Sequence, residues 1–331
     1  MTEAVRSFDV HVHFVPASVQ RRAGEEWLPA LHWESGRQVM EYGGHSVRAV
    51  TREFADLSGL LRDSGAMGLD RLLLSPWANL LADNFDGQKA LKVAGLQNEG
   101  MQAAAEECPE RLFSLGTVCM RQPEVAARQL EELIRHPLLA GVEISTTIAG
   151  RLLGDQFFLP FWEAAEATQA LVFVHPSQLG FGLEALQRHR LWNLVGNPSE
   201  TAFTAADMVL AGVLERFPNL KVVLAHAGGS FLAMRGRVAH GWRVAEEVRR
   251  DLASPPDRSF ARFHFDTIAH DATMLRRLIE FAGPGHVLLG SDYPFDMAPE
   301  DPVGDLLKMN LGEDATQRIL LGNALRLTGS G

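Results

Sequence analysis

The chain has 331 residues, of which 46% are hydrophobic and 22% are charged, so it can form a large core and is neither disordered nor fibrous. Its formal net charge of -10 disfavours binding to nucleic acid or to an anionic membrane surface. No apolar run approaches the roughly 20 residues of a membrane span. We therefore expect neither a nucleic-acid partner nor a membrane partner.

The N-terminal residues lead from acidic Glu3 straight into a strand-like segment, without the apolar region of a signal peptide. This predicts a cytoplasmic protein. The two cysteines, Cys108 and Cys119, are too few and too widely spaced for a disulfide framework or a zinc knuckle.

Short runs rich in leucine or β-branched residues alternate with longer helix-like stretches along the chain. The strand-like runs cover residues 8–12, 70–75, 112–118, 141–145, 171–174, 221–225, 263–267 and 287–290. The helix-like stretches cover residues 88–107, 123–135, 155–168, 198–216, 231–250 and 272–281. Eight strands alternating with helices predict an α/β protein with a (β/α)8 TIM-like barrel.

Residues 15–54 interrupt this alternation with few periodic apolar positions, so we interpret them as an insertion over the barrel mouth. Helices after Pro302 are expected to cap the C-terminal side. No flexible linker or internal repeat separates the chain into parts, which predicts one domain over residues 1–331.

Metal-binding residue types recur where predicted strands end. His11 and His13 project to the same side of the first strand because side chains alternate along a strand. His175, His226 and Asp292 follow the fifth, sixth and eighth runs. The carboxyl ends of barrel strands form one rim, so we expect all five to meet there. Imidazole and carboxylate together suit zinc or a similar divalent ion with an open position.

One ion is favoured over two, because residues 141–145 offer no lysine to bridge a pair. The acid in that segment, Glu143, either contacts a substrate or faces a helix. The other histidines, including His270 on the rim and His286 at the opposite face, are assigned no role.

Seven segments together resemble the metal-dependent amidohydrolase superfamily of the amidohydrolase-2 type. Within it they are similar to the decarboxylase branch typified by 2-amino-3-carboxymuconate-6-semialdehyde decarboxylase. The segments are DVHVH (9–13), RLF (111–113), VFVHP (172–176), NPSET (197–201), AHAGG (225–229), GRV (236–238) and LGSDYPF (289–295). The likeness covers most of the chain.

The resemblance implies a role for each site residue. The metal ligands would be His11, His13, His175 and Asp292, holding one Zn2+ per chain, although another divalent metal is possible. His226 would act as acid and base beside the ion, and with Asp292 it would form the catalytic pair.

The resemblance also implies the residues that bind substrate. Arg48 and Arg237 would bind a substrate carboxylate, and Phe295 would line the pocket. The family arginine that Arg237 matches reaches in from the neighbouring subunit, which predicts a homodimer. The chain departs from the family at Ser177 and near His189, where the typical pocket has tryptophan, and this leaves the substrate open.

The expected function is nonoxidative, zinc-dependent decarboxylation of a small unsaturated or aromatic carboxylic acid, within aromatic compound catabolism. The alternative is metal-dependent hydrolysis of a lactone, amide or ring carbonyl at the same site. A metal-stabilised binding protein is a third interpretation. An open metal position beside a strand-end histidine has little purpose in such a scaffold.

Overall fold

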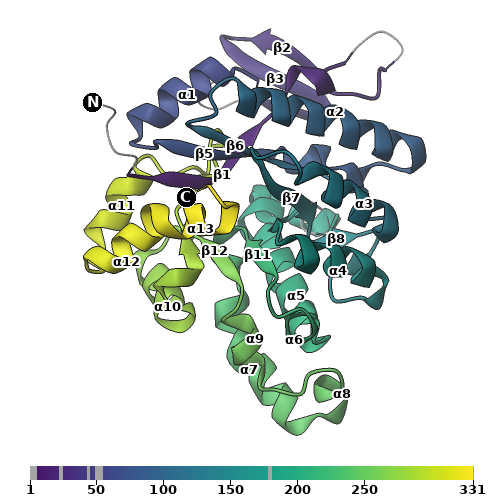
Figure 1. Ribbon diagram of the computed structural model, residues 1–331, viewed down its shortest axis with the longest axis vertical. Helices are drawn as coiled ribbons and strands as arrows, with labels where there is room; N and C mark the ends of the chain where they lie inside the picture. The colour runs from purple at the N-terminus through teal and green to yellow at the C-terminus, as the bar shows by residue number, and fades with distance from the viewer. Residues whose placement is uncertain (1–5, 22–24, 43–44, 49–54, 178–180, 331) are drawn as a thin grey trace.

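The computed structural model describes residues 6–21, 25–42, 45–48, 55–177 and 181–330, and for residues 42 and 45–48 it describes the backbone alone. Eight parallel strands form the centre of the molecule (Figure 1). In order around the sheet they are β1 (Phe8–Phe14), β5 (Arg71–Pro76), β6 (Leu112–Gly116), β7 (Leu139–Ser145), β10 (Leu171–His175), β11 (Lys221–Leu224), β12 (His264–Asp266) and β13 (Val287–Leu288). Each strand lies within two residues of its predicted bounds.

The sheet closes on itself through β1 and the segment that follows β13. Val12 forms a parallel bridge with Tyr293, and the Val10 amide donates to the Leu289 carbonyl over 2.9 Å. The predicted α/β class and TIM-like barrel are therefore confirmed.

Helices surround the barrel and follow the strands in the predicted alternation. They are α1 (Leu57–Ala66), α2 (Gly87–Glu106), α3 (Pro123–Leu133), α4 (Leu159–Thr168), α5 (Asn197–Leu210), α6 (Val213–Arg216), α7 (Phe231–Val244), α8 (Glu246–Arg249), α9 (Pro256–Phe260) and α10 (Ala272–Ala282). The expected C-terminal helices are α11 (Pro302–Lys308), α12 (Glu313–Gln317) and α13 (Asn323–Thr328), of which α13 packs against β1 (Figure 1). Among the described residues, no helix is both long enough and apolar enough to cross a bilayer.

Three predicted helices were too long. The helix expected over 155–168 begins with a 3-10 turn at Gln156–Phe158, capped by the Asp155 carboxylate, before α4 starts. The helix expected over 198–216 breaks between α5 and α6, where Gly212 has a left-handed φ of 70°. The helix expected over 231–250 stops at Val244, because Ala245 is extended before α8 begins.

The alternation of side chains along each strand builds two apolar layers. On β10, Val172 and Val174 belong to the outer layer, which includes Trp162 of α4. Phe173 belongs to a second cluster that draws residues from six barrel strands and includes Leu327 of α13. Both clusters are buried, so the barrel forms a packed core and leaves its rim for the functional site.

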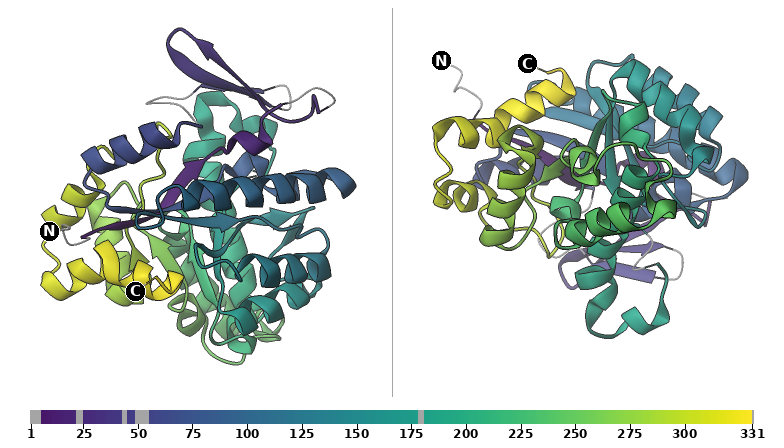
Figure 2. Two further views of the ribbon diagram at one scale, coloured as in Figure 1. Left: turned by 45° about the horizontal axis from the view of Figure 1, so that its top comes forward. Right: turned by 90° about the horizontal axis from the view of Figure 1, so that it is seen from below.

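The insertion contains a small antiparallel sheet that was not predicted (Figure 2). Its strands are β2 (Ala30–Glu34), β3 (Arg37–Tyr42) and β4 (His45–Arg48). Buried Met40 of β3 packs in a cluster with Leu28, Trp77 and Phe85, and Trp77 directly follows β5. The insertion therefore packs at the side of the barrel where the strands end. The single-domain division stays a prediction.

Candidate metal centre

Two histidines and an aspartate meet at the barrel rim where β1 approaches the segment after β13. The Nε2 atoms of His11 and His13 lie 3.2 Å apart, and Asp292 Oδ1 lies 3.4 Å and 3.3 Å from them. The other ring nitrogens are occupied: His11 Nδ1 bonds Asp266 and His13 Nδ1 donates to the Pro76 carbonyl. Both Nε2 lone pairs therefore face the same point.

His175, at the end of β10, and His226, just after β11, complete the group. One ligand atom each of His11, His175, His226 and Asp292 lies within 4.8 Å of the others, and these four could hold a metal ion. His175 Nε2 is buried without a hydrogen-bond partner among the described residues. His226 Nε2 lies 3.8 Å from Asp292 Oδ2.

The structure thus brings together all five residues that the sequence predicted for the rim. It does not separate their roles, because His13 and His226 both lie at the cluster. The assignment of His13 as a ligand and His226 as an acid and base stays a prediction.

Asp266, at the end of β12, organises the cluster and was missed from the sequence. Its Oδ2 accepts from His11 Nδ1 and from the His226 amide, each over 2.8 Å. Its Oδ1 accepts from the amides of Ala227 and Ile268 over 2.7 Å and 3.0 Å. An acid at a strand end, the signal that identified Asp292, was present here too.

The backbone around the cluster is locally strained. His226 and Asp292 have left-handed φ values of 55° and 60°, which non-glycine residues adopt at an energetic cost. Hydrogen bonds offset this cost: Asp266 holds the amide of His226, and the Asp292 amide donates to the His11 carbonyl over 2.8 Å. Such strain is typical of functional positions.

Asp9 fastens the first strand to the segment that carries Asp292. Its Oδ1 accepts from the amides of His11 and Ser291 over 3.0 Å and 3.1 Å, and its Oδ2 accepts from Ser291 Oγ over 2.5 Å. Burial raises the pKa of Asp9 to about 7, although these hydrogen bonds oppose the rise. Asp9 therefore has a structural role beneath the cluster.

Burial and the Asp292 carboxylate act in opposite directions on the four histidines. Burial lowers the pKa of His11 and, much further, that of His175, so both are neutral imidazoles able to bind a metal. Burial also lowers the pKa of His13 and His226, but the interaction with Asp292 and the charges of nearby carboxylates together outweigh burial, so the pKa of both is raised. The same interaction with these histidines holds the Asp292 pKa well below its usual range despite its burial.

Two further residues adjoin the cluster. Glu143 of β7 is fully buried, its Oε1 lies 3.9 Å from His175 Nδ1, and burial raises its pKa to about 8. Glu143 was expected either to contact a substrate or to face a helix, and its position beside His175 favours the first of these. The Phe295 ring lies edge-on to His13 with centroids 5.2 Å apart, as a pocket residue would.

The two arginines predicted to bind substrate lie away from these contacts. Arg48 pairs through its backbone with Val39 in the small sheet, and its side chain lies outside the described residues. Arg237 is exposed on α7, which projects from the barrel in Figure 1. Its guanidinium has no ion-pair partner within the described part of the chain. Both roles stay predictions.

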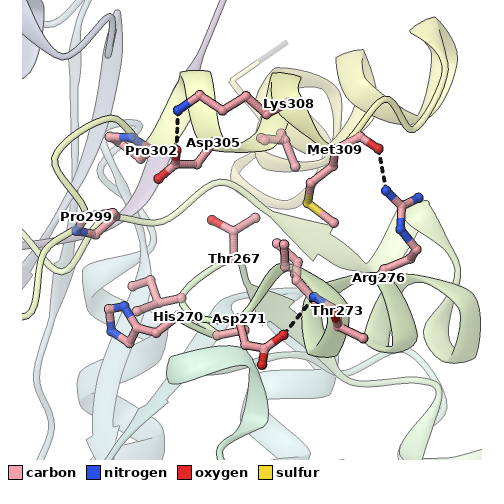
Figure 3. Close-up of a pocket in the computed structure, with 15 residues that line it drawn as sticks. Thr267, His270, Asp271, Thr273, Arg276, Pro299, Pro302, Asp305, Lys308 and Met309 are labelled. Carbon is pink, nitrogen blue, oxygen red and sulfur yellow. Dashed lines mark hydrogen bonds and ion pairs between the residues drawn. The ribbon is translucent and has the colours of Figure 1, made fainter.

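A cavity of about 310 Å3 leads to the cluster and is lined by both His226 and Asp292. A larger cavity of about 710 Å3 lies between α10 and α11 and shares His270 with it (Figure 3). The cationic groups of the larger cavity have partners of their own: Lys308 pairs with Asp305 over 2.7 Å, and Arg276 donates to the Met309 carbonyl (Figure 3). The smaller cavity is the one that reaches the candidate ligands.

A closed barrel with clustered imidazole and carboxylate groups on its carboxyl-end rim is the arrangement of a barrel enzyme that binds a metal. The chain belongs to the amidohydrolase family, whose model matches residues 8–329.

The relatives narrow the reaction class. The chain is 29% identical to 2-amino-3-carboxymuconate-6-semialdehyde decarboxylase of Dictyostelium discoideum, covering 97% of this chain and 91% of the relative. It is 26% identical to 6-methylsalicylic acid decarboxylase of Penicillium expansum, covering 96% and 95%. The crystal structure of 5-carboxyvanillate decarboxylase from Sphingomonas paucimobilis is similar with a TM-score of 0.80 at 25% identity, covering 98% and 99%. The predicted resemblance is confirmed, and the chain is an enzyme of the carboxy-lyase class.

Proposed function

We propose that the protein is a zinc-dependent, nonoxidative decarboxylase of an unsaturated or aromatic carboxylic acid. The observation that carries the proposal is the buried histidine and aspartate cluster at the end of a cavity of about 310 Å3, a size suited to a small ligand. The named substrates of the relatives, an aminocarboxymuconate semialdehyde and 6-methylsalicylic acid, are small unsaturated or aromatic acids.

The cluster fits a divalent cation on its own geometry. The two facing Nε2 lone pairs of His11 and His13, 3.2 Å apart, repel each other unless a positive charge lies between them. The unpartnered Nε2 of His175 and the carboxylate of Asp292 complete a set of three imidazoles and one carboxylate. This set suits zinc and also accepts manganese.

In the proposed decarboxylation, the metal ligands hold the ion that orients the substrate acid, and His226 protonates the substrate. A bound ion would orient the acid and stabilise negative charge that develops in the reaction. His226, whose pKa Asp292 raises, holds a proton at the cavity wall and delivers it to the carbon that loses its carboxyl group. Carbon dioxide leaves as the bond between this carbon and the carboxyl group breaks. The electrons of that bond restore the double bond that protonation removed, so no oxidant is needed.

The active form in this proposal is a homodimer in which Arg237 of one subunit binds the substrate carboxylate in the other. Arg237 supports this by its exposed position on the projecting α7. A guanidinium binds a carboxylate through two parallel hydrogen bonds, which fixes the acid for reaction. The sequence expectation of a cytoplasmic protein belongs to the same proposal.

The test is release of carbon dioxide from a panel of benzoic and salicylic acids, including 6-methylsalicylic acid, by metal-free protein with and without added zinc or manganese. We expect release that depends on the metal and is lost in His226→Ala. A set of lactones and cyclic amides is assayed alongside. Metal-dependent hydrolysis of these compounds without release of carbon dioxide from any acid would replace the decarboxylase proposal with the hydrolase alternative.

A further inference from the structure

A buried carboxamide without a hydrogen-bond partner begins α5. Asn197 is 9% exposed, and its Oδ1 is buried without a partner among the described residues. Buried amide groups in folded proteins are nearly always hydrogen-bonded, because an unpaired one loses its water without compensation. Asn197 therefore pays an energetic cost in the free protein that a bound molecule can relieve.

Asn197 faces the cavity that leads to the metal centre. It lines that cavity together with His226 and Asp292. Asn193 lines the same cavity, four positions earlier, in the π-helical turn Trp192–Gly196 that leads into α5. Positions four apart lie on the same face of a helix, so two carboxamides form one polar strip on the cavity wall.

The first turn of α5 is fixed relative to His226. The Pro198 carbonyl accepts from the Ser230 amide over 3.1 Å, and a Cβ on Gly229 would come within 2.0 Å of that oxygen. This close approach explains the glycine, which also has a left-handed φ of 62°. The carboxylate of Glu200, fully buried one turn later, accepts from Thr146 Oγ1 over 3.0 Å. Asn197 is thus held on a rigid wall.

Much of the remaining cavity wall is apolar. Ile268, Met274 and Met297 contribute to it, and such side chains suit the faces of an aromatic ring. A carboxamide can donate through Nδ2 and accept through Oδ1, so it pairs with a hydroxyl or an amino group.

We propose that Asn197 is a specificity-determining residue that hydrogen-bonds a hydroxyl or amino substituent on the ring of the substrate acid. This inference rests on the proposed function and deepens it, because it selects ring-substituted acids over the bare ring. The substituent lies on the side of the ring that faces α5, while the carboxyl group faces the metal centre. Asn193 extends the same polar strip toward the entrance.

The experiment measures binding by calorimetry to the metal-loaded enzyme with benzoate and its single hydroxy and amino derivatives as probes. We expect wild type to bind at least one derivative roughly three- to tenfold more tightly than benzoate. Asn197→Leu, of similar size, should remove that preference while benzoate affinity stays the same. Ser199→Ala is the matched control on the same helical turn, because Ser199 bonds the Val195 carbonyl and does not line the cavity.

Thermal unfolding separates this role from a structural one. If the amide serves binding alone, Asn197→Leu should be at least as stable as wild type, whereas a structural amide would lose stability on substitution. Asn197→Ala and the half-buried Asn193→Leu repeat the binding test if the first variant folds poorly.

Three results would overturn the proposal. They are a preference in Asn197→Leu equal to that of wild type, an absence of any preference in wild type, and an absence of binding of every probe. Release of carbon dioxide by wild type is measured on the same samples. A preference lost in Asn197→Leu without release from any acid would retain the role of Asn197 and refute the decarboxylase function alone.

Discussion

Replacement of Asp266 by asparagine should weaken both metal binding and folding, for reasons that the four hydrogen bonds of this carboxylate define. If the new amide nitrogen takes the place of Oδ2, it faces two donors, His11 Nδ1 and the His226 amide, both 2.8 Å away in wild type. His11 can then accept at Nδ1 only by moving its proton to Nε2, which removes the lone pair that binds the metal.

If the amide nitrogen instead takes the place of Oδ1, the backbone amides of Ala227 and Ile268 lose their acceptor. Each unpaired buried amide costs about 1–3 kcal/mol, so the free energy of unfolding should fall by about 2–6 kcal/mol. In both orientations the negative charge behind His11 is lost, and metal affinity should fall about 10- to 100-fold.

Metal affinity is measured by competition with a chelator, and the free energy of unfolding by urea titration of the metal-free protein. Asp83→Asn is the control, because Asp83 is equally buried and accepts from the amides of Met120 and Ser145, yet makes no contact with the cluster histidines in the structure. The control should lose stability and keep its metal affinity. Wild-type metal affinity in Asp266→Asn would refute the argument from the tautomer of His11.

Three further outcomes follow, two from the site and one from the buried His264. Elemental analysis should find about one metal ion per wild-type chain and less in His11→Ala and Asp292→Ala, because each variant lacks a ligand. His226→Ala should keep the metal and lower turnover by roughly two to four orders of magnitude. A metal-free His226→Ala protein would show instead that His226 is a ligand. Mixing inactive His226→Ala and Arg237→Ala chains should restore about a quarter of wild-type activity. About half of the dimers are then mixed, and each mixed dimer has one intact site of two. No recovery after proven subunit exchange would contradict a site shared between subunits. Burial lowers the pKa of His264 from 6.5 to about 3. Between these two pH values the unfolded chain binds a proton at His264 and the folded chain does not. The free energy of unfolding therefore falls by about 1.4 kcal/mol for each pH unit below 6.5, down to about pH 3. Urea unfolding of His264→Phe should therefore lose about 2 kcal/mol less than wild type between pH 7 and pH 5, and an unchanged loss would show that His264 does not titrate this way.

The barrel and the candidate ligands could be predicted because their signals are local. Each strand is a short apolar run, and each candidate ligand lies near or just beyond the end of such a run, so position along the chain also gives position in space. The role of Asp266 was not predictable in this way, because its partners His11 and His226 come from other strands. The small sheet of the insertion was missed since few of the side chains that the structure describes in β2 and β3 are buried, which leaves a weak hydrophobic pattern. Asn197 lies in the NPSET segment, but nothing in the sequence indicated its role, because its lack of a partner is a property of the packed structure alone.

The hydrogen bonds between β1 and the segment after β13 determine when the metal site forms during synthesis of the chain. Asp9 and Ser291, joined by two hydrogen bonds, are separated by 282 positions, and Asp292 follows immediately. A growing chain therefore holds His11 and His13 long before the carboxylate that completes their site leaves the ribosome. Metal captured at that stage binds only part of the ligand set, so full affinity arises after the barrel has closed. Because a ligand stabilises the state that binds it, metal supply should act late, slowing the opening of finished molecules more than it speeds their formation.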